Sequence, residues 1–117
     1  MKTILVAEDN DSNYILMTYI LKRDYQYKRA RNGQEAVQMV GEGGIDLVLM
    51  DIKMPVMDGL EATAKIKEAW PELPVIALTA NAFDEDVQRS LQAGLNAHLS
   101  KPVEPDALFE TLQSLIR

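Results

Sequence analysis

The sequence contains no cysteine, and this absence removes several kinds of chemistry at once. Disulfide bonds, thiolate metal sites and a cysteine nucleophile are all excluded. A long apolar run is absent too, and the apolar run near the N-terminus is short. Signal peptides and membrane spans need longer apolar stretches, so neither is predicted. We therefore expect a cytoplasmic protein, or a cytoplasmic piece of a larger one.

Positive charge is also scarce, with 12 basic residues against 18 acidic ones and a net charge of −6. Phosphate groups would be repelled, so direct nucleic-acid binding and binding to a membrane surface are disfavoured, whereas a metal cation or a basic partner is not. The hydrophobic fraction of 47% and the charged fraction of 26% are ordinary for a soluble globular protein. The length of 117 residues suits a single domain spanning residues 1–117.

Short apolar runs alternate with longer segments of helical spacing. Strands are predicted at Thr3–Ala7, Tyr25–Ala30, Ile45–Met50, Pro74–Leu78 and Ala97–Ser100. Helices are predicted from Asp11 or Ser12 to about Lys22, from Asn32-Gly33 to Val40, from Asp58-Gly59 to about Trp70, through Phe83, Val87 and Leu91, and from Pro105 onward. Five successive strand–helix units predict an α/β fold with a parallel sheet and right-handed crossovers.

Chemically active side chains follow four of the predicted strands. Glu8 and Asp9 follow the first, Asp51 the third, Thr79 the fourth and Lys101 the fifth. In parallel sheets of this kind, sites form beyond the carboxyl ends of the strands. If these ends converge, the site holds three carboxylates, one hydroxyl and one ammonium. Such packed carboxylates repel one another, and a hard divalent cation such as magnesium, manganese or calcium relieves the repulsion.

Each of these residues alone has an ordinary structural explanation. Glu8 and Asp9 can be solvated loop acids or can help to start a helix. Asp51 can end a strand before a turn, Thr79 can be a strand-end hydroxyl, and Lys101 can be a solvated lysine. Their combined placement at four strand ends is what favours a site.

The chemistry of this set suits phosphoryl transfer. A carboxylate such as Asp51 can attack phosphorus and form an acyl phosphate. Positioning and charge neutralisation supply most of the catalysis in this reaction. The metal and Lys101 would neutralise phosphoryl oxygens, Thr79 would donate a hydrogen bond, and backbone N–H groups after Asp51 and Thr79 would add donors.

Four sequence motifs resemble those of the receiver domains of bacterial two-component response regulators. They are LVAED at residues 5–9, LVLMDIKMPVMDG at 47–59, IALTANA at 76–82 and LSKP at 99–102. The resemblance covers essentially the whole chain, and the order and spacing of the motifs make it specific. It implies a flavodoxin-like (βα)5 fold, in which a doubly wound five-stranded parallel sheet lies between two layers of helices.

The resemblance also implies roles for the acidic residues. Asp51 is the implied phosphoacceptor. Glu8 and Asp9 form the implied metal pair, with Asp9 as a direct ligand and Glu8 acting through water. Asp51 itself and the backbone carbonyl of Lys53 complete the implied ligand set. Magnesium is the implied metal, with manganese as an alternative.

At the other strand ends, Thr79 is the implied switch hydroxyl and Lys101 the phosphoryl-binding lysine, followed by a cis Lys101–Pro102 bond. Receivers often have Tyr or Phe three residues before this lysine, where this chain has His98. His98 can act as a switch residue or can be a surface strand residue, and both interpretations stay open. Lys53 and Asn81 occupy positions that flank the attacking water in the family.

The implied phosphodonor is a phosphohistidine on a sensor histidine kinase or a phosphotransfer protein, and the implied output is a downstream protein target or a kinase. We expect a phosphoacceptor switch rather than an enzyme, as a monomer or a weak phosphorylation-linked dimer. The chain ends with the last predicted helix, so we expect no attached output domain. A stand-alone regulator and the receiver of a hybrid sensor kinase both fit, and MDGLEA and ANAFDED resemble the latter.

Other functions on a similar fold fit the sequence less well. A flavodoxin would need a phosphate loop rich in Ser, Thr and Gly after the first strand, where this chain has Glu8-Asp9. A haloacid-dehalogenase-type phosphatase would need an acid where this chain has Lys53, and the phosphate loop of NTPases is absent. A receiver-like docking module that is never phosphorylated stays open as the alternative.

Overall fold

The structure is a computed structural model, and it describes residues 1–54, 56–79 and 94–116. Five strands are present: β1 (Thr3–Ala7), β2 (Gln26–Ala30), β3 (Leu47–Asp51), β4 (Val75–Thr79) and β5 (Ala97–Ser100). The described helices are α1 (Asp11–Leu21), α2 (Gly33–Gly41), α3 (Gly59–Ala69) and α5 (Pro105–Ile116). The predicted helix through Phe83, Val87 and Leu91 lies outside the described residues, as does Asn81. No described helix has the length and apolar character needed to cross a membrane.

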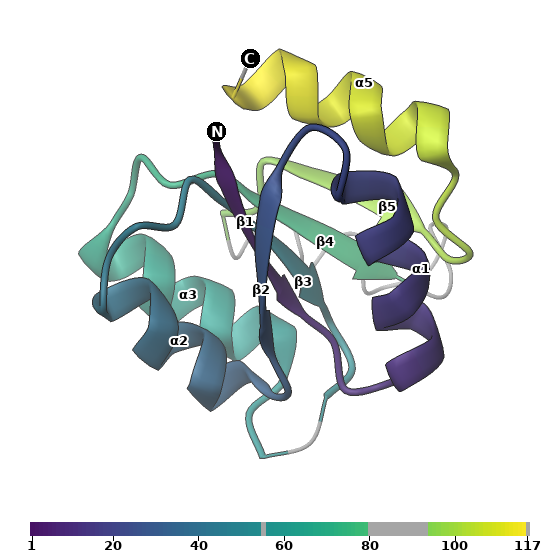
Figure 1. Ribbon diagram of the computed structural model, residues 1–117. Helices are drawn as coiled ribbons and strands as arrows, with labels where there is room; N and C mark the ends of the chain where they lie inside the picture. The colour runs from purple at the N-terminus through teal and green to yellow at the C-terminus, as the bar shows by residue number, and fades with distance from the viewer. Residues whose placement is uncertain (55, 80–93, 117) are drawn as a thin grey trace.

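The five strands form one sheet in the order β2-β1-β3-β4-β5, and every neighbouring pair is parallel. Helices α2 and α3 cover one face of the sheet, and α1 and α5 cover the other (Figure 1). The chain winds outward in one direction to β2 and then in the other direction to β5, so the sheet is doubly wound. The predicted three-layer flavodoxin-like α/β fold is therefore confirmed.

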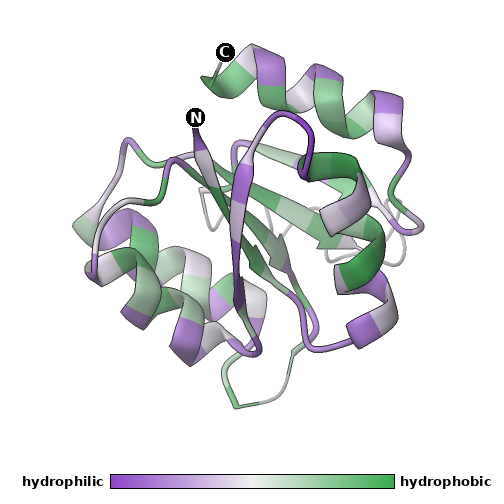
Figure 2. Ribbon diagram, viewed as in Figure 1, coloured by the Kyte–Doolittle hydropathy of each residue, from purple (hydrophilic) through white to green (hydrophobic). Residues whose placement is uncertain are grey.

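The residues of the three central strands are mostly apolar (Figure 2), and their side chains are buried on both sides of the sheet. On one side they pack with Ala36, Val40, Leu60, Ala62 and Ile66 from α2 and α3. On the other they pack with Met17, Ile20, Leu21, Leu108 and Leu112 from α1 and α5. Strands β2 and β5 lie at the edges of the sheet and are more exposed, which explains why their sequences are less apolar.

The helix starts depend on capping side chains that precede them. Asn10 caps α1, because its side-chain oxygen accepts a hydrogen bond from the backbone N–H of Asn13 at 3.0 Å. The expectation that Asp11 or Ser12 caps this helix was therefore wrong: Asp11 is already the first helical residue. Asn10 has the extended backbone of a cap, and Asn, Asp and Ser compete for this position with similar preference.

The loop between β3 and α3 is packed tightly against the end of β3. The backbone N–H of Gly59 donates to the carbonyl of Ile52 at 2.8 Å, and that of Gly33 donates to the carbonyl of Met57 at 3.0 Å. A Cβ atom at Gly59 would overlap the carbonyl oxygen of Asp51. Glycine is therefore required there for the close approach of two backbone segments beside Asp51.

Gly59→Ala should destabilise the fold by about 2 kcal/mol or more, because the added methyl group forces backbone to move. Urea denaturation measures the change. Gly41→Ala is the matched control, since a Cβ there meets only the tip of Trp70 at 3.5 Å and Gly41 lies in α2. The control should be unchanged or more stable by up to about 1 kcal/mol. Equal stability of Gly59→Ala and the wild type would contradict the packing argument.

Candidate functional site

Strand register brings the four predicted strand ends to one edge of the sheet. Ala7 pairs with Met50, Asp51 pairs with Leu78, and Thr79 pairs with Ser100. The residues just beyond these pairs therefore lie at a common level. Asp51 and Thr79 are themselves the last residues of β3 and β4, one residue beyond the predicted strand ends.

The three predicted acids do converge. Glu8, Asp9 and Asp51 each offer a carboxylate oxygen, and these oxygens all lie within 4.8 Å of one another. Glu8 is fully buried and Asp51 is only 4% exposed, whereas Asp9 is exposed. Two of the three charges are thus removed from water, which is costly unless a cation compensates them.

Lys101 supplies one such cation. Its Nζ lies 3.0 Å from Oδ2 of Asp51 and 3.3 Å from Oε2 of Glu8. The Lys101–Pro102 peptide bond is cis, as the resemblance implied. One ammonium against the carboxylates of Glu8, Asp9 and Asp51 leaves this group of four residues with an excess of negative charge.

Burial and the charge of Glu8 change the protonation of Asp51. Its pKa is raised to about 6, first by burial and then by the charge of Glu8, and contact with Lys101 offsets only part of this rise. Burial alone would lower the pKa of Lys101, but the hydrogen bond and charge of Asp51, followed by the charge of Glu8, raise it above its ordinary value. Lys101 therefore stays charged, while Asp51 changes protonation just below neutral pH.

Two further polar groups complete the immediate surroundings of Asp51. The backbone N–H of Lys53 donates to Oδ1 of Asp51 at 3.2 Å. The hydroxyl of Thr79 is buried and has no hydrogen-bond partner in the described part of the chain. A buried hydroxyl without a partner is unusual and is suited to an incoming oxygen ligand. The metal-ligand role of the Lys53 carbonyl stays a prediction, as does the switch role of Thr79.

His98 lies in β5 and is partly buried, opposite Ala77 of β4. Such burial is compatible with both interpretations of His98, the switch residue and the strand residue. The backbone N–H of Lys101, three residues on, donates to the carbonyl of Thr79 at 2.7 Å, so the ends of β4 and β5 are linked directly.

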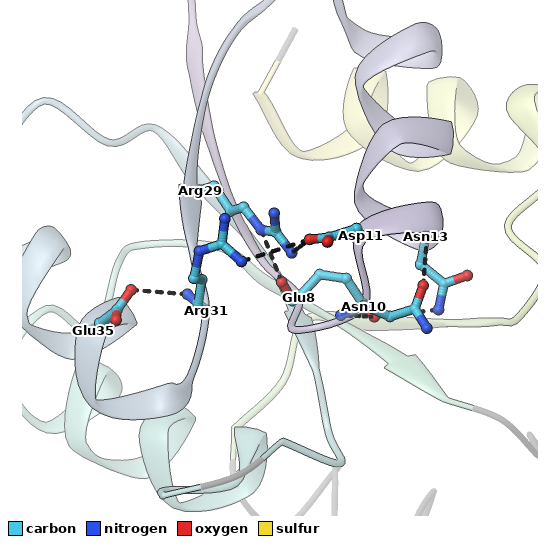
Figure 3. Close-up of polar contacts among 7 residues, drawn as sticks. All are labelled: Glu8, Asn10, Asp11, Asn13, Arg29, Arg31 and Glu35. Atoms are coloured by element: carbon cyan, nitrogen blue, oxygen red, sulfur yellow. Dashed lines mark hydrogen bonds and ion pairs between the residues drawn. The ribbon is translucent and has the colours of Figure 1, made fainter.

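Residues that were not predicted from the sequence hold the acidic turn, Glu8-Asp9 after β1, in place (Figure 3). Oε1 of Glu8 accepts from Nδ2 of Asn13 at 3.2 Å and from the backbone N–H of Asn10 at 3.4 Å. Nε of Arg29 donates to the backbone carbonyl of Glu8 at 3.1 Å. Asn13 lies in the first turn of α1, only five residues after Glu8, so closeness in the sequence offered a signal for it. Arg29 comes from β2, and only the pairing of β1 with β2 brings it close.

Arg29 also forms an ion pair, with Nη2 2.8 Å from Oδ1 of Asp11. Its guanidinium lies over the ring of Tyr14, with Cζ 4.5 Å from the ring centroid. The hydrogen bond from Arg29 and its charge hold the pKa of Asp11 below its ordinary value. Asp11 therefore stays ionised and keeps this contact through the physiological pH range.

Comparison with known proteins gives a consistent result across most of the chain. The family model of the response regulator receiver domain matches residues 4–113. The sensor histidine kinase RcsC of Salmonella typhi is 43% identical over 110 residues, which cover 93% of this chain. The match covers only 12% of RcsC, so this chain corresponds to a small part of that protein.

Solved structures agree with this result. The receiver domain of the sensor histidine kinase PA1611 from Pseudomonas aeruginosa PAO1 has a TM-score of 0.92 and 37% identity, covering 98% of this chain and 97% of that one. That structure has a magnesium ion coordinated in the active-site cleft. The receiver domain of Ssk1 from Saccharomyces cerevisiae, solved with the histidine phosphotransfer protein Ypd1, has a TM-score of 0.88 and 34% identity, covering 98% of this chain and 92% of that one.

Without metal, Asp51 should make stability depend on pH. Its pKa is about 6 in the folded protein, against an ordinary value of 3.8. The folded state therefore binds more protons between these values, and the free energy of unfolding falls as pH rises from 3.8 to about 6. Asp51→Asn removes this loss and should stabilise the metal-free protein at pH 7.5 by about 2 kcal/mol, with much less effect at pH 4.

Urea denaturation in EDTA at the two pH values measures this difference. Asp58→Asn is the matched control, because Asp58 caps α3 and Asn caps a helix equally well. The same stabilisation in both variants, or none in Asp51→Asn at pH 7.5, would contradict the charge argument.

Proposed function

Because this chain belongs to the response regulator receiver family, we propose that it accepts a phosphoryl group on Asp51 with the help of a divalent cation. The proposal rests mainly on the surroundings of Asp51, which lies beside both a lysine cation and the other two carboxylates of the acidic cluster. Its carboxylate lies 3.0 Å from Nζ of Lys101 and within 4.8 Å of oxygens from Glu8 and Asp9. The chain is a receiver of two-component phosphorelay signalling, and the transfer to Asp51 is the proposed step.

The residues present fit magnesium. Carboxylate oxygens are hard ligands of the kind that Mg²⁺ selects, and the site has more negative charge than Lys101 neutralises. Both oxygens of Glu8 already contact donors, Asn13 and Lys101. We therefore propose that Asp9 and Asp51 are direct ligands, together with the carbonyl of Lys53, and that Glu8 acts through water. Manganese, another hard cation, would bind the same oxygens. Bound metal supplies positive charge that offsets the charge of the phosphoryl oxygens.

An ionised oxygen of Asp51 is the nucleophile in this proposal. It forms a bond to phosphorus as the bond from phosphorus to the donor's imidazole nitrogen breaks, and the electron pair of that bond stays on the nitrogen. The product is an acyl phosphate on Asp51. With a pKa of about 6, Asp51 is mostly ionised at pH 7.5, which suits this role.

Other groups bind the phosphoryl oxygens as they arrive. Lys101 is charged and already lies 3.0 Å from the nucleophilic carboxylate, so it can pair with one oxygen without a large movement. The hydroxyl of Thr79, which has no hydrogen-bond partner among the described residues, can donate to another oxygen. The backbone N–H of Lys53 gives a third donor. In phosphoryl transfer, positioned donors and charges supply most of the catalysis.

We propose a phosphohistidine of a sensor histidine kinase or of a phosphotransfer protein as the donor. The similarity to RcsC, to the PA1611 receiver and to Ssk1 in its complex with Ypd1 supports this choice. The phosphorylated chain would then change a surface that a downstream protein or kinase recognises. In this proposal it acts in the cytoplasm, as a monomer or a weak phosphorylation-linked dimer. It is a switch that catalyses only its own modification rather than an enzyme.

The decisive experiment is intact mass spectrometry after incubation with Mg²⁺ and acetyl phosphate or phosphoramidate. We expect one added phosphoryl group on the wild type, none in EDTA, and none on Asp51→Asn. Asp58→Asn, at the start of α3, is the matched control and should be modified like the wild type. Modification of Asp51→Asn to the same extent would show that another residue is the acceptor. No adduct on any protein, even after rapid quenching, would favour the unphosphorylated docking module.

Thr79→Val should separate stability from phosphoryl transfer. The Thr79 hydroxyl is buried and has no partner in residues 1–54, 56–79 and 94–116, so its loss should stabilise the metal-free protein or leave it unchanged. The same loss should slow adduct formation about tenfold, the effect of one hydrogen bond to a charged group.

Thr63→Val provides the matched control, because Oγ1 of Thr63 is buried but donates to the carbonyl of Gly59 at 2.7 Å. It should destabilise the fold by about 1 kcal/mol and leave the rate unchanged. Equal rates for Thr79→Val and the wild type would remove Thr79 from the mechanism.

A further inference from the structure

Arg29 makes three contacts beside the acidic turn, and Figure 3 shows two of them, those with Glu8 and Asp11. Its Nε donates to the Glu8 carbonyl at 3.1 Å, its Nη2 lies 2.8 Å from Oδ1 of Asp11, and its guanidinium covers Tyr14. The side chain is only 14% exposed. An arginine this buried, with one donor on a backbone carbonyl, differs from the exposed ion pairs that contribute little to folding.

The carbonyl that Arg29 holds belongs to the peptide between Glu8 and Asp9. The backbone N–H of Glu8 is held as well, by the carbonyl of Ala30 at 3.0 Å. Both backbone polar groups of Glu8 are therefore bound to the end of β2. Asp9, the exposed member of the acidic cluster, follows directly, and the orientation of the Glu8–Asp9 peptide sets the direction in which its side chain leaves the backbone.

We propose that Arg29 is a positioning residue for the metal site: by fixing the Glu8–Asp9 peptide, it directs the carboxylate of Asp9 toward Asp51. The inference rests on the proposed function, because it assumes that these carboxylates bind Mg²⁺. Groups that orient metal ligands through hydrogen bonds typically change metal affinity by about 10- to 100-fold when they are removed.

Electrostatics alone predicts the opposite effect. Arg29 is a cation close to a cation site, so removal of its charge would strengthen Mg²⁺ binding if charge were its only influence. Loss of the ion pair would also free the negative charge of Asp11, with the same sign of effect. Weaker binding after neutralisation of Arg29 therefore points to position rather than charge.

Arg31, which follows the last residue of β2, provides a matched control. Its Nη1 lies 3.6 Å from the same oxygen of Asp11, but its side chain is 63% exposed. In the described part of the chain, its guanidinium donates no hydrogen bond to Glu8 or Asp9. Arg31→Gln thus removes one positive charge near the site and leaves the Glu8–Asp9 peptide held.

The test is titration of the metal-free protein with Mg²⁺ by isothermal calorimetry at pH 7.5. Arg29→Gln should raise the Kd about tenfold, whereas Arg31→Gln should leave it unchanged or lower it. Arg29→Lys keeps the charge but has a single ammonium for two acceptors, and we expect the Kd to rise about threefold. A Kd for Arg29→Gln at or below that of the wild type would overturn the inference, as would an equal rise in Arg31→Gln.

Thermal unfolding in EDTA shows whether each variant is folded at the titration temperature. A purely structural role would lower the unfolding midpoint and leave the Kd of the folded protein unchanged. If Arg29→Gln does not fold, Arg29→Lys decides, and a Kd equal to the wild type overturns the inference. The wild-type titration tests the proposed function separately: no Mg²⁺ binding there would refute the metal site itself, whatever the variants do.

Discussion

Repulsion between buried carboxylates is the constraint on which the carboxyl edge of this sheet depends. Glu8 is fully buried and Asp51 nearly so, with Asp9 beside them. Lys101 contacts two of these acids but supplies only one charge. A proton or a cation can relieve the remainder: burial first, and then the charge of Glu8, raises the pKa of Asp51 to about 6. In the proposed function, the same charge that destabilises the metal-free site favours the binding of a metal cation and, with it, of a phosphoryl group.

The rest of the fold keeps these charges from moving apart. The apolar strands β1, β3 and β4 pack on both faces, so their ends have little freedom. Gly59 lets the start of α3 approach Asp51, and Asn13 and Arg29 hold the acidic turn from α1 and β2. Natural proteins break local rules mainly where they function. The buried charges are such violations, as is the Thr79 hydroxyl, which no group in the described part of the chain binds.

Much of this arrangement was predictable from local patterns. The runs TILVA and PVIAL are apolar without alternation, which indicated buried parallel strands, and polar residues directly after each run indicated the site. The β2 sequence QYKRA gave a weaker signal, because an edge strand has less need of apolar residues. The cap of α1 was predicted wrongly, because Asn10, Asp11 and Ser12 are all good capping residues and the sequence does not choose among them.

The succession of strands and helices could be predicted from the sequence alone, as could the charged and polar groups at the strand ends, because both follow from short-range periodicity. Three features emerge only in the folded chain: Lys101 contacts both Asp51 and Glu8, burial raises the pKa of Asp51, and Arg29 reaches the Glu8 carbonyl. These depend on register between strands distant in the chain, such as the pairing of Val6 with Arg29. Register is set by the requirement that each strand bury its apolar residues in the assembled sheet, and the sequence of a single strand does not show which residue of a distant strand it will pair with.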